Sequence, residues 1–254
     1  MVALEKNIFL RSIAIGLIAG VLSGIFGVGG GFIMVPLFVL WLYLEQKNAH
    51  ATSLVAIIFV AIAAAVGYVS SHNVNWNFAG LIFIGGIIGT FIGVRIFNSI
   101  SQTLLRNVFS LVLIAVAIRL LWSSTPHQLF TGKLADLVLV VIGILSGTLS
   151  GLLGIGGGII IVPALIMCSG VQPEVARGTS LIVIIGTALL GSVLHNRSGH
   201  INWKVGVLTG LAGVPAAIVG SHFGTLASNH VIMPLFSMLL LLVVGQLFVS
   251  NRGQ

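Results

Sequence analysis

The chain has 254 residues, of which 57% are hydrophobic and only 6% are charged, and its mean hydropathy is +1.20. Because a soluble domain carries about 25% charged residues, this composition excludes an ordinary soluble protein and indicates one whose solvent is largely lipid. The net charge of +7 comes from basic residues that stand singly between apolar segments. This spacing indicates loops at anionic lipid headgroups and not a nucleic-acid surface.

Eight apolar runs follow one another along the chain, and most are long enough for a membrane-spanning helix of about 20 residues. They are 9–44, 51–70, 78–97, 104–122, 134–168, 179–194, 203–223 and 231–250. The first run continues far beyond the length of a signal peptide, so we expect a retained first helix. No run alternates polar and apolar residues as a barrel strand does, so we expect an all-α integral membrane protein.

Two of the runs, 9–44 and 134–168, are too long for one crossing, and each contains a glycine cluster. The clusters are Gly27-Val-Gly29-Gly30-Gly31 and Gly154-Ile-Gly156-Gly157-Gly158. Adjacent glycines break a helix because each costs about 1 kcal/mol relative to alanine. We therefore expect each run to divide into a full helix and a shorter second helix. Pro36 and Pro163 would lie in the first turns of the shorter helices, where proline is tolerated.

The second half of the chain repeats the first with an offset of 127 residues, which is the difference between positions 163 and 36. Residues 20–36 match residues 147–163, and the same offset aligns Thr52-Ser53 with Thr179-Ser180. It also aligns Asn75-Trp76 with Asn202-Trp203, where we expect the asparagines to cap helices and the tryptophans to lie at the interface. The sequence therefore predicts two homologous units, residues 1–127 and 128–254.

The breaks give five helices in each unit and ten in total. With the N-terminus in the cytoplasm, ten crossings place more of the 11 basic residues on the cytoplasmic side than eight crossings do. An odd number of crossings in each unit makes the two units inverted, as in many secondary transporters. If the short helices are re-entrant, eight crossings remain. We expect a multi-pass protein of the cell (inner) membrane with a cytoplasmic N-terminus.

The glycine clusters are the first candidate site. Irregular backbone persists in a membrane only inside protein or along a wet cavity. Helix N-termini carry about half a positive charge and bind anions. Two such ends from inverted units would face one central site, so we expect backbone amides at Gly29, Gly30, Gly31, Gly156, Gly157 and Gly158 to bind an anion. The alternative is that these glycines only allow helices to cross closely.

Polar residues at the third helix of each unit are further candidates. Thr52, Ser53, Thr179 and Ser180 begin that helix, where their hydroxyls either cap it or reach an oxyanion. Arg177 is the one basic residue beside a repeat motif. It either attracts or gates an anion or lies at the surface.

Two histidines and an arginine near helix ends have simpler interpretations. His195 aligns with Tyr68, and we expect it at the membrane interface, although a histidine is also able to carry a coupling proton. Arg95 aligns with His222, and both come late in a helix, where snorkelling to the interface explains them.

Signals for catalysis are missing. The first glycine cluster does not match the nucleotide-binding pattern G-x-G-x-x-G, because Phe32 occupies the position of the third glycine. No Walker lysine and no HExxH motif is present. The four acids, Glu5, Glu45, Asp136 and Glu174, all lie at the edges of apolar runs, so no intramembrane carboxylate relay is expected. We expect a protein that is not an enzyme and needs no cofactor or metal. A coupling proton or cation remains open.

The twice-repeated element G-[VI]-G-G-G-x-x-x-x-Pro, followed each time by Thr-Ser, resembles the sulfite exporter TauE/SafE family over residues 13–249. The resemblance implies a small secondary carrier of sulfite, organosulfonates or other small sulfur-containing or carboxylate anions. It also implies that the glycines, Pro36, Pro163 and the Thr-Ser pairs belong to the substrate site. The second unit has Arg177-Gly178 where the first has His50-Ala51, so the halves need not contribute equally.

We therefore expect alternating access of two units around a small anion. The alternatives are a channel-like anion pore and a membrane assembly partner without flux. The sequence predicts neither the oligomeric state nor the direction of transport.

Overall fold

The structure is a computed structural model that describes residues 2–121, 132–226 and 229–249. In these residues the chain forms ten helices and no strand, which confirms the all-α prediction. They are α1 (Val2–Phe26), α2 (Gly31–Leu42), α3 (Gln46–Ser70), α4 (Trp76–Ser99), α5 (Gln102–Leu121), α6 (Lys133–Leu153), α7 (Gly158–Ser169), α8 (Pro173–Asn196), α9 (Trp203–Leu226) and α10 (Asn229–Val249).

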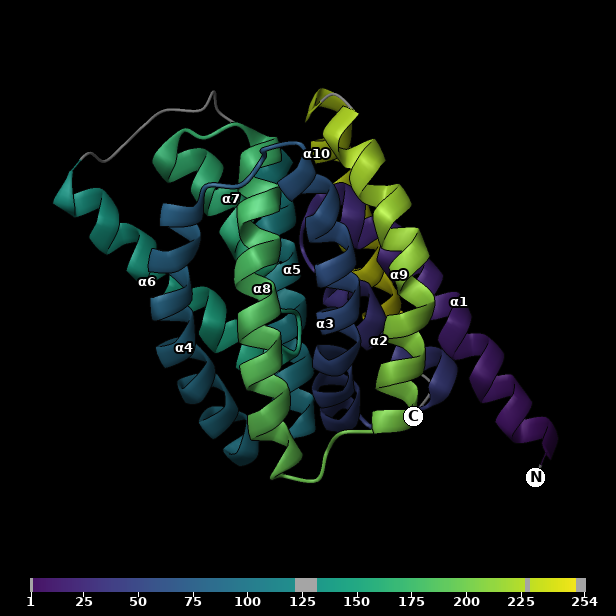
Figure 1. The fold of residues 1–254 in the computed structure, drawn as a ribbon. Coiled ribbons are helices and arrows are strands. Elements are labelled where there is room, and N and C mark those ends of the chain that lie inside the picture. Colours follow the sequence, from purple (N-terminus) through teal and green to yellow (C-terminus); the bar gives the residue numbers. More distant parts are fainter. Residues whose placement is uncertain (1, 122–131, 227–228, 250–254) are drawn as a thin grey trace.

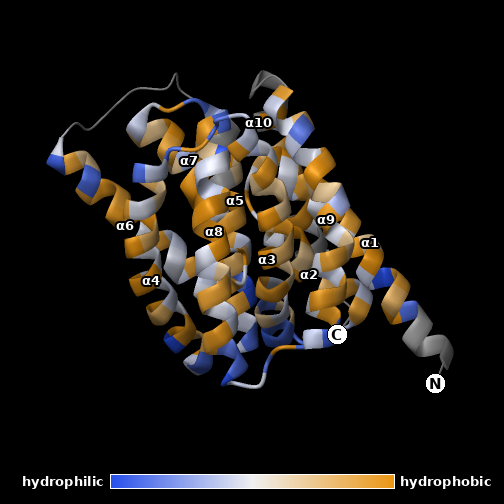
Figure 2. Ribbon diagram, viewed as in Figure 1, coloured by the Kyte–Doolittle hydropathy of each residue, from blue (hydrophilic) through white to orange (hydrophobic). Residues whose placement is uncertain are grey.

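The bundle has the surface of a multi-pass membrane protein. Six of the described helices are long and apolar enough to cross a membrane, namely α1, α3, α4, α6, α8 and α9. Large apolar side chains such as Val66, Leu137 and Leu211 are more than half exposed on these helices. Hydrophobic residues make up most of the length of the helices, and hydrophilic residues gather near the helix ends (Figure 2). The number of crossings, eight or ten, stays a prediction.

Both long apolar runs divide at their glycine clusters, as predicted. The break lies between α1 and α2 in the first half and between α6 and α7 in the second. Gly29 and Gly30 have φ angles of 81° and 76°, and Gly156 and Gly157 both have 82°. Residues with a Cβ disfavour this left-handed backbone, so the helix stops where glycines permit it to turn.

The prolines of the short helices lie one turn further in than predicted. Pro36 is inside α2 and Pro163 is inside α7, each five positions after the glycine that begins the helix. The prediction of a first-turn position was wrong because each short helix starts directly at the last glycine of its cluster. Pro36 is buried and Pro163 is half-buried.

Helices α3 and α8 form the centre of the bundle. They have the largest buried share of the six candidate spans, 67% and 61%. In Figure 1 they stand between the pair α1 and α9 and the pair α4 and α6. Glycines allow each outer pair to pack closely, because a Cβ on Gly20 would meet the α9 backbone and one on Gly89 would meet the α6 backbone. The two glycine breaks therefore lie in the interior of the bundle, against α3 and α8.

Candidate functional site

The two glycine breaks meet in the interior of the bundle. A Cβ on Gly31 would lie 2.6 Å from the carbonyl oxygen of Gly154 and 2.8 Å from the Cα of Ile155. A Cβ on Gly158, which is 127 positions after Gly31, would lie 2.7 Å from the Cα of Val28. Real Cβ contacts are not this short, so only glycine fits where the two backbones cross. The structure thus brings together the two breaks that the sequence placed 127 residues apart.

Both short helices begin without a side-chain cap. The N-cap residues are Gly30 for α2 and Gly157 for α7, and neither helix start has a side-chain cap hydrogen bond. Backbone bonds resume at Ile33 and Met34, whose amides both donate to the carbonyl oxygen of Gly30. Because the first amides of a helix have no intrahelical acceptor, each break presents N–H groups that a bound anion is able to accept from.

Two isoleucines close the centre in this conformation. Ile57 of α3 and Ile184 of α8 are fully buried and are themselves 127 positions apart. A Cβ on Gly29 would lie 3.0 Å from Ile184 Cγ2 and 3.3 Å from Ile57 Cγ2, and one on Gly156 would meet the same two side chains at 2.8 Å and 3.4 Å. The glycines therefore also permit close packing, and in this conformation the two isoleucines lie directly against the breaks.

The threonines of the Thr-Ser pairs hold loops. Helices α3 and α8 begin at Gln46 and Pro173, several residues before the pairs, so the capping interpretation was wrong. Thr52 Oγ1 accepts a hydrogen bond of 2.9 Å from the amide of Asn202, and Thr179 Oγ1 accepts one of 2.9 Å from the amide of Asn75. Each threonine therefore fixes the position of the residue that precedes a helix in the other half of the chain.

The asparagines cap helices as predicted. Asn75 Oδ1 accepts from the amide of Phe78 at 3.1 Å, and Asn202 Oδ1 accepts from the amide of Val205 at 3.1 Å. The neighbouring tryptophans are exposed near the same helix ends.

The two serines of the pairs differ although both are fully buried. Ser53 Oγ lies 2.7 Å from the carbonyl oxygen of His50 and 2.7 Å from that of Gly154, so its hydroxyl is committed to the backbone at the second break. Ser180 Oγ has no hydrogen-bond partner among the described residues. It lies 3.0 Å from the position of a Cβ on Gly158, beside the first residue of α7. A hydroxyl without a partner thus lies at one of the two helix starts.

Arg177 is buried, with 1% of its surface exposed, so the prediction of a surface position was wrong. Its Nη1 donates a hydrogen bond of 2.6 Å to the carbonyl oxygen of Gly224, near the end of α9. The side-chain stem covers Gly27, because a Cβ there would lie 2.9 Å from Arg177 Cγ. The guanidinium also interacts with the hydroxyl of Tyr68. A cation at a helix C-terminus is favourable, which explains this burial.

His50, which aligns with Arg177, has a corresponding place in the other half. It is fully buried, and its ring contacts the carbonyl oxygen of Leu153, the last residue of α6. Gln46 Nε2 lies 2.9 Å from His50 Nε2. Since the amide nitrogen of glutamine only donates, His50 Nε2 accepts and Nδ1 carries the proton that bonds Leu153.

His195 also lies inside the protein and not at the interface. It is fully buried, and its Nε2 donates to the carbonyl oxygen of Gly151 at 2.8 Å. Tyr68, its counterpart, donates to the carbonyl oxygen of Gly24 at 2.9 Å, and Gly24 and Gly151 are again 127 positions apart. The alignment of His195 with Tyr68 was the sequence signal for this shared role. A coupling proton on His195 stays a prediction.

Among the described residues no group of three or more His, Cys, Asp or Glu side chains is arranged to hold a metal ion. The described residues around the two breaks include backbone amides, the hydroxyls of Ser53 and Ser180, and the buried guanidinium of Arg177.

The comparisons with known proteins cover both halves of the chain. The family model described as Sulfite exporter TauE/SafE matches residues 5–120 and 138–254. A relative from Bacillus subtilis named "Probable membrane transporter protein YunE" is 31% identical over 242 residues, which span 85% of this chain and 87% of that protein. A relative from Methanocaldococcus jannaschii, also named as a membrane transporter, is 30% identical over 220 residues, or 82% and 79% of the two chains. The chain belongs to the sulfite exporter TauE/SafE family of membrane transporters.

Proposed function

We propose that the protein is a secondary transporter of a small anion, and that the anion is sulfite, an organosulfonate or a related sulfur-containing anion. The observation that carries this proposal is the meeting of two uncapped helix starts, α2 and α7, in the buried centre. Both present N–H groups and the positive end of a helix dipole to one place. The family supports sulfite and related anions as the substrate class.

Reciprocal contacts support two inverted units around this centre. The bond from Asn75 to Thr179 and the bond from Asn202 to Thr52 have the same length of 2.9 Å and exchange under the 127-residue offset. Likewise a Cβ on Gly20 would meet the carbonyl oxygen of Gly213, and a Cβ on Gly147 would meet that of Gly86, which is the same contact with the two halves exchanged. Such exchange is what a twofold axis between homologous units produces, and units with five crossings each are inverted.

The closed centre supports a mechanism of alternating access. Ile57 and Ile184 pack against the breaks, so neither side of the membrane reaches the amides in this conformation. Rocking of one unit against the other would separate the isoleucines on one side at a time. The anion would then replace apolar contacts at Gly29–Gly31 and Gly156–Gly158.

The two halves are proposed to bind the anion unequally. Ser180 offers a hydroxyl at the start of α7, whereas Ser53 is held by two carbonyl oxygens. An oxyanion near α7 would accept from Ser180 Oγ and from the amides of Gly157 and Gly158. Arg177 lies one turn before Ser180 and is proposed to add attraction for the anion as well as capping α9.

Flux through proteoliposomes tests the proposal. The purified protein is reconstituted and given labelled sulfite, taurine as an organosulfonate, and acetate as a small carboxylate, with protein-free liposomes as the control. We expect saturable uptake of at least one of these anions and stimulation by the same anion on the other side. An imposed pH gradient in the same liposomes tests a coupling proton. The proposal is refuted if none of the three anions shows saturable flux. Flux that is not stimulated by the same anion on the other side would indicate a channel and not a carrier.

A further inference from the structure

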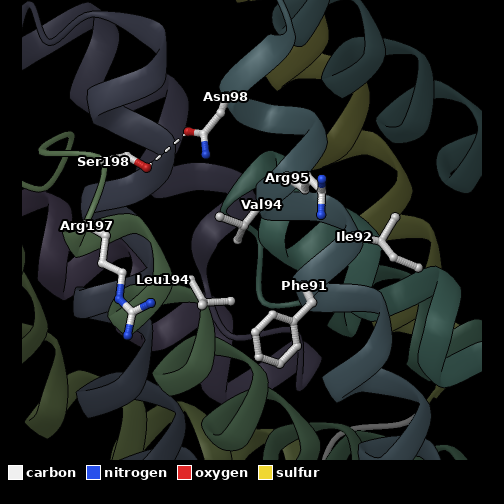
Figure 3. Close-up of a pocket in the computed structure, with 8 residues that line it drawn as sticks. All are labelled: Phe91, Ile92, Val94, Arg95, Asn98, Leu194, Arg197 and Ser198. Carbon is white, nitrogen blue, oxygen red and sulfur yellow. Dashed lines mark hydrogen bonds between the residues drawn. The ribbon is translucent and has the colours of Figure 1, made fainter.

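A groove lies between the ends of α4 and α8, apart from the glycine breaks. Its volume is about 470 Å³, and α4 contributes residues to one wall and α8 to the other (Figure 3). The lining residues that matter here are Phe91, Arg95, Asn98, Leu194, Arg197 and Ser198. Asn98 and Ser198 close one end by a hydrogen bond of 3.1 Å between their side chains.

The groove carries two positive charges, those of Arg95 and Arg197. Arg95 and Arg197 are exposed on opposite walls, and within the part of the chain that the structure describes neither guanidinium has a hydrogen-bond or ion-pair partner. Asp136 and Glu174 lie in the first turns of α6 and α8, whereas the groove lies at the last turn of α8. Glu45 accepts a hydrogen bond from Gln102 just beyond α4 and does not line the groove. Two free guanidinium groups across a groove are suited to hold a phosphate, because each offers several donors in a planar array.

Polarity changes along the groove. Arg95 and Asn98 belong to the last turns of α4, and Phe91 lies a turn deeper; on the other wall Leu194 precedes Arg197 and Ser198. Phe91 and the neighbouring Ile92 are 51% and 43% exposed on the apolar outer surface. The groove therefore joins a cationic end near the helix termini to an apolar end on the face that contacts lipid.

The groove is not simply a product of the repeat. The residues 127 positions from Arg95 and Arg197 are His222 and Ser70, so the corresponding place has no arginine. Gly67 stands there in place of Leu194, and a Cβ on it would lie 2.9 Å from the Cβ of Ser221. The small residue lets α3 approach α9, whereas Leu194 keeps α8 away from α4. The open, basic groove is thus confined to one end of the bundle.

We propose that this groove binds one anionic phospholipid. The phosphate lies between Arg95 and Arg197, and an acyl chain runs along Phe91 and Leu194. A small free anion would pair with the guanidinium groups but would leave the apolar half of the groove uncovered. A phospholipid covers both halves and is therefore the better complement. Basic pockets between membrane helices are suited to such headgroups.

Lipid binding to the purified protein in a neutral detergent tests the proposal, independently of transport. Phosphatidylglycerol, phosphatidylcholine and inorganic phosphate are titrated separately, and thermal unfolding and native mass spectrometry report binding. We expect phosphatidylglycerol to bind at one saturable site and to raise Tm, with weaker effects of the other two. Each basic residue at an anionic surface contributes about fivefold in affinity, so the Arg95→Gln, Arg197→Gln double variant should bind about thirtyfold more weakly. His222→Ala, at the corresponding place, should bind as the wild type does.

Three results would overturn the assignment. One is unchanged phosphatidylglycerol binding by the double variant. Another is equal protection by inorganic phosphate, which would make the groove a free-anion site. The third is equal binding of phosphatidylcholine. If the double variant does not fold, the Arg95→Lys, Arg197→Lys variant keeps both charges and loses only the planar donors. It should retain selectivity for phosphatidylglycerol over phosphatidylcholine, and loss of that selectivity would also count against the proposal.

Discussion

Removing the hydroxyl of Ser180 tests the proposed unequal site, because the chain supplies its own control at Ser53. Both serines occupy the same position of the repeat and both are fully buried. They differ in what their hydroxyls contact, since Ser53 Oγ has two carbonyl acceptors and Ser180 Oγ has no partner among the described residues. Ser180→Ala and Ser53→Ala are therefore the same chemical change in two different environments.

The structure predicts opposite effects of the two substitutions. Ser53→Ala removes the donor to the buried carbonyl oxygen of Gly154, and an unpaired buried polar group costs about 1–3 kcal/mol of the free energy of unfolding. Ser180→Ala removes no hydrogen bond that the described residues make, so stability should be unchanged or slightly higher. A hydrogen bond to a charged group contributes about 1.5–3 kcal/mol. Loss of the Ser180 bond to an anion should therefore weaken sulfite binding about tenfold to a hundredfold.

Two measurements separate these effects. Thermal unfolding in detergent reports stability, and we expect a lower Tm for Ser53→Ala alone. Initial rates of sulfite uptake over a concentration series report KM, and we expect a higher KM for Ser180→Ala alone. Ser180→Thr keeps a hydroxyl and should preserve more of the affinity than alanine does.

The reasoning is refuted if Ser180→Ala has the KM of the wild type while the wild type itself transports sulfite. Equal loss of stability in both alanine variants would also refute it, because Ser180 would then have a structural partner like Ser53. Absence of sulfite flux in the wild type is a different result, which bears on the choice of substrate and on the proposed function.

Two further substitutions follow from the same geometry. Gly30→Ala forces a Cβ onto a φ of 76° and to within 2.8 Å of the carbonyl oxygen of Ala19, so we expect a loss of about 2–5 kcal/mol in unfolding free energy and no sulfite flux. The control is Gly80→Ala in α4, where a Cβ meets nothing within 4 Å, and it should be neutral or stabilising in the same assays. Wild-type stability and flux of Gly30→Ala would contradict this account of the break. Thr179→Val removes the acceptor of the Asn75 amide and should cost about 1–3 kcal/mol, whereas Thr179→Ser should not; an unchanged Tm for the valine variant would show that the bond is dispensable.

The features that the sequence predicted correctly depend on local pattern. Long apolar runs require helices in lipid, and the clusters at Gly29–Gly31 and Gly156–Gly158 require those helices to break. The asparagine caps at Asn75 and Asn202 are also local, because the acceptor and the amide are three residues apart. Each of these outcomes follows from a few neighbouring residues, so the sequence alone was enough.

The predictions that were wrong concern polar residues whose partners are distant in the chain. For Arg177 the alternative of a surface position was wrong, because its buried guanidinium bonds Gly224, 47 residues away, near the end of another helix. His195 was expected at the interface, but its ring bonds Gly151, 44 residues away. A polar side chain is buried in a membrane protein when a carbonyl at a helix end or a close glycine crossing is within reach, and only the packing shows which helix end that is.

The sequence by itself determined that this protein is an all-helical membrane protein with two glycine-broken helices at matching positions, because composition, run length and glycine spacing are properties of the chain. Only the tertiary structure decided that the breaks cross each other at Gly31 and Gly158, that Ile57 and Ile184 close them, and that Ser53 is engaged while Ser180 is not. The repeat gives the two serines the same sequence position. The packing around them differs, because the Gly154 carbonyl oxygen lies within hydrogen-bond distance of Ser53 Oγ, whereas no acceptor among the described residues is within reach of Ser180 Oγ.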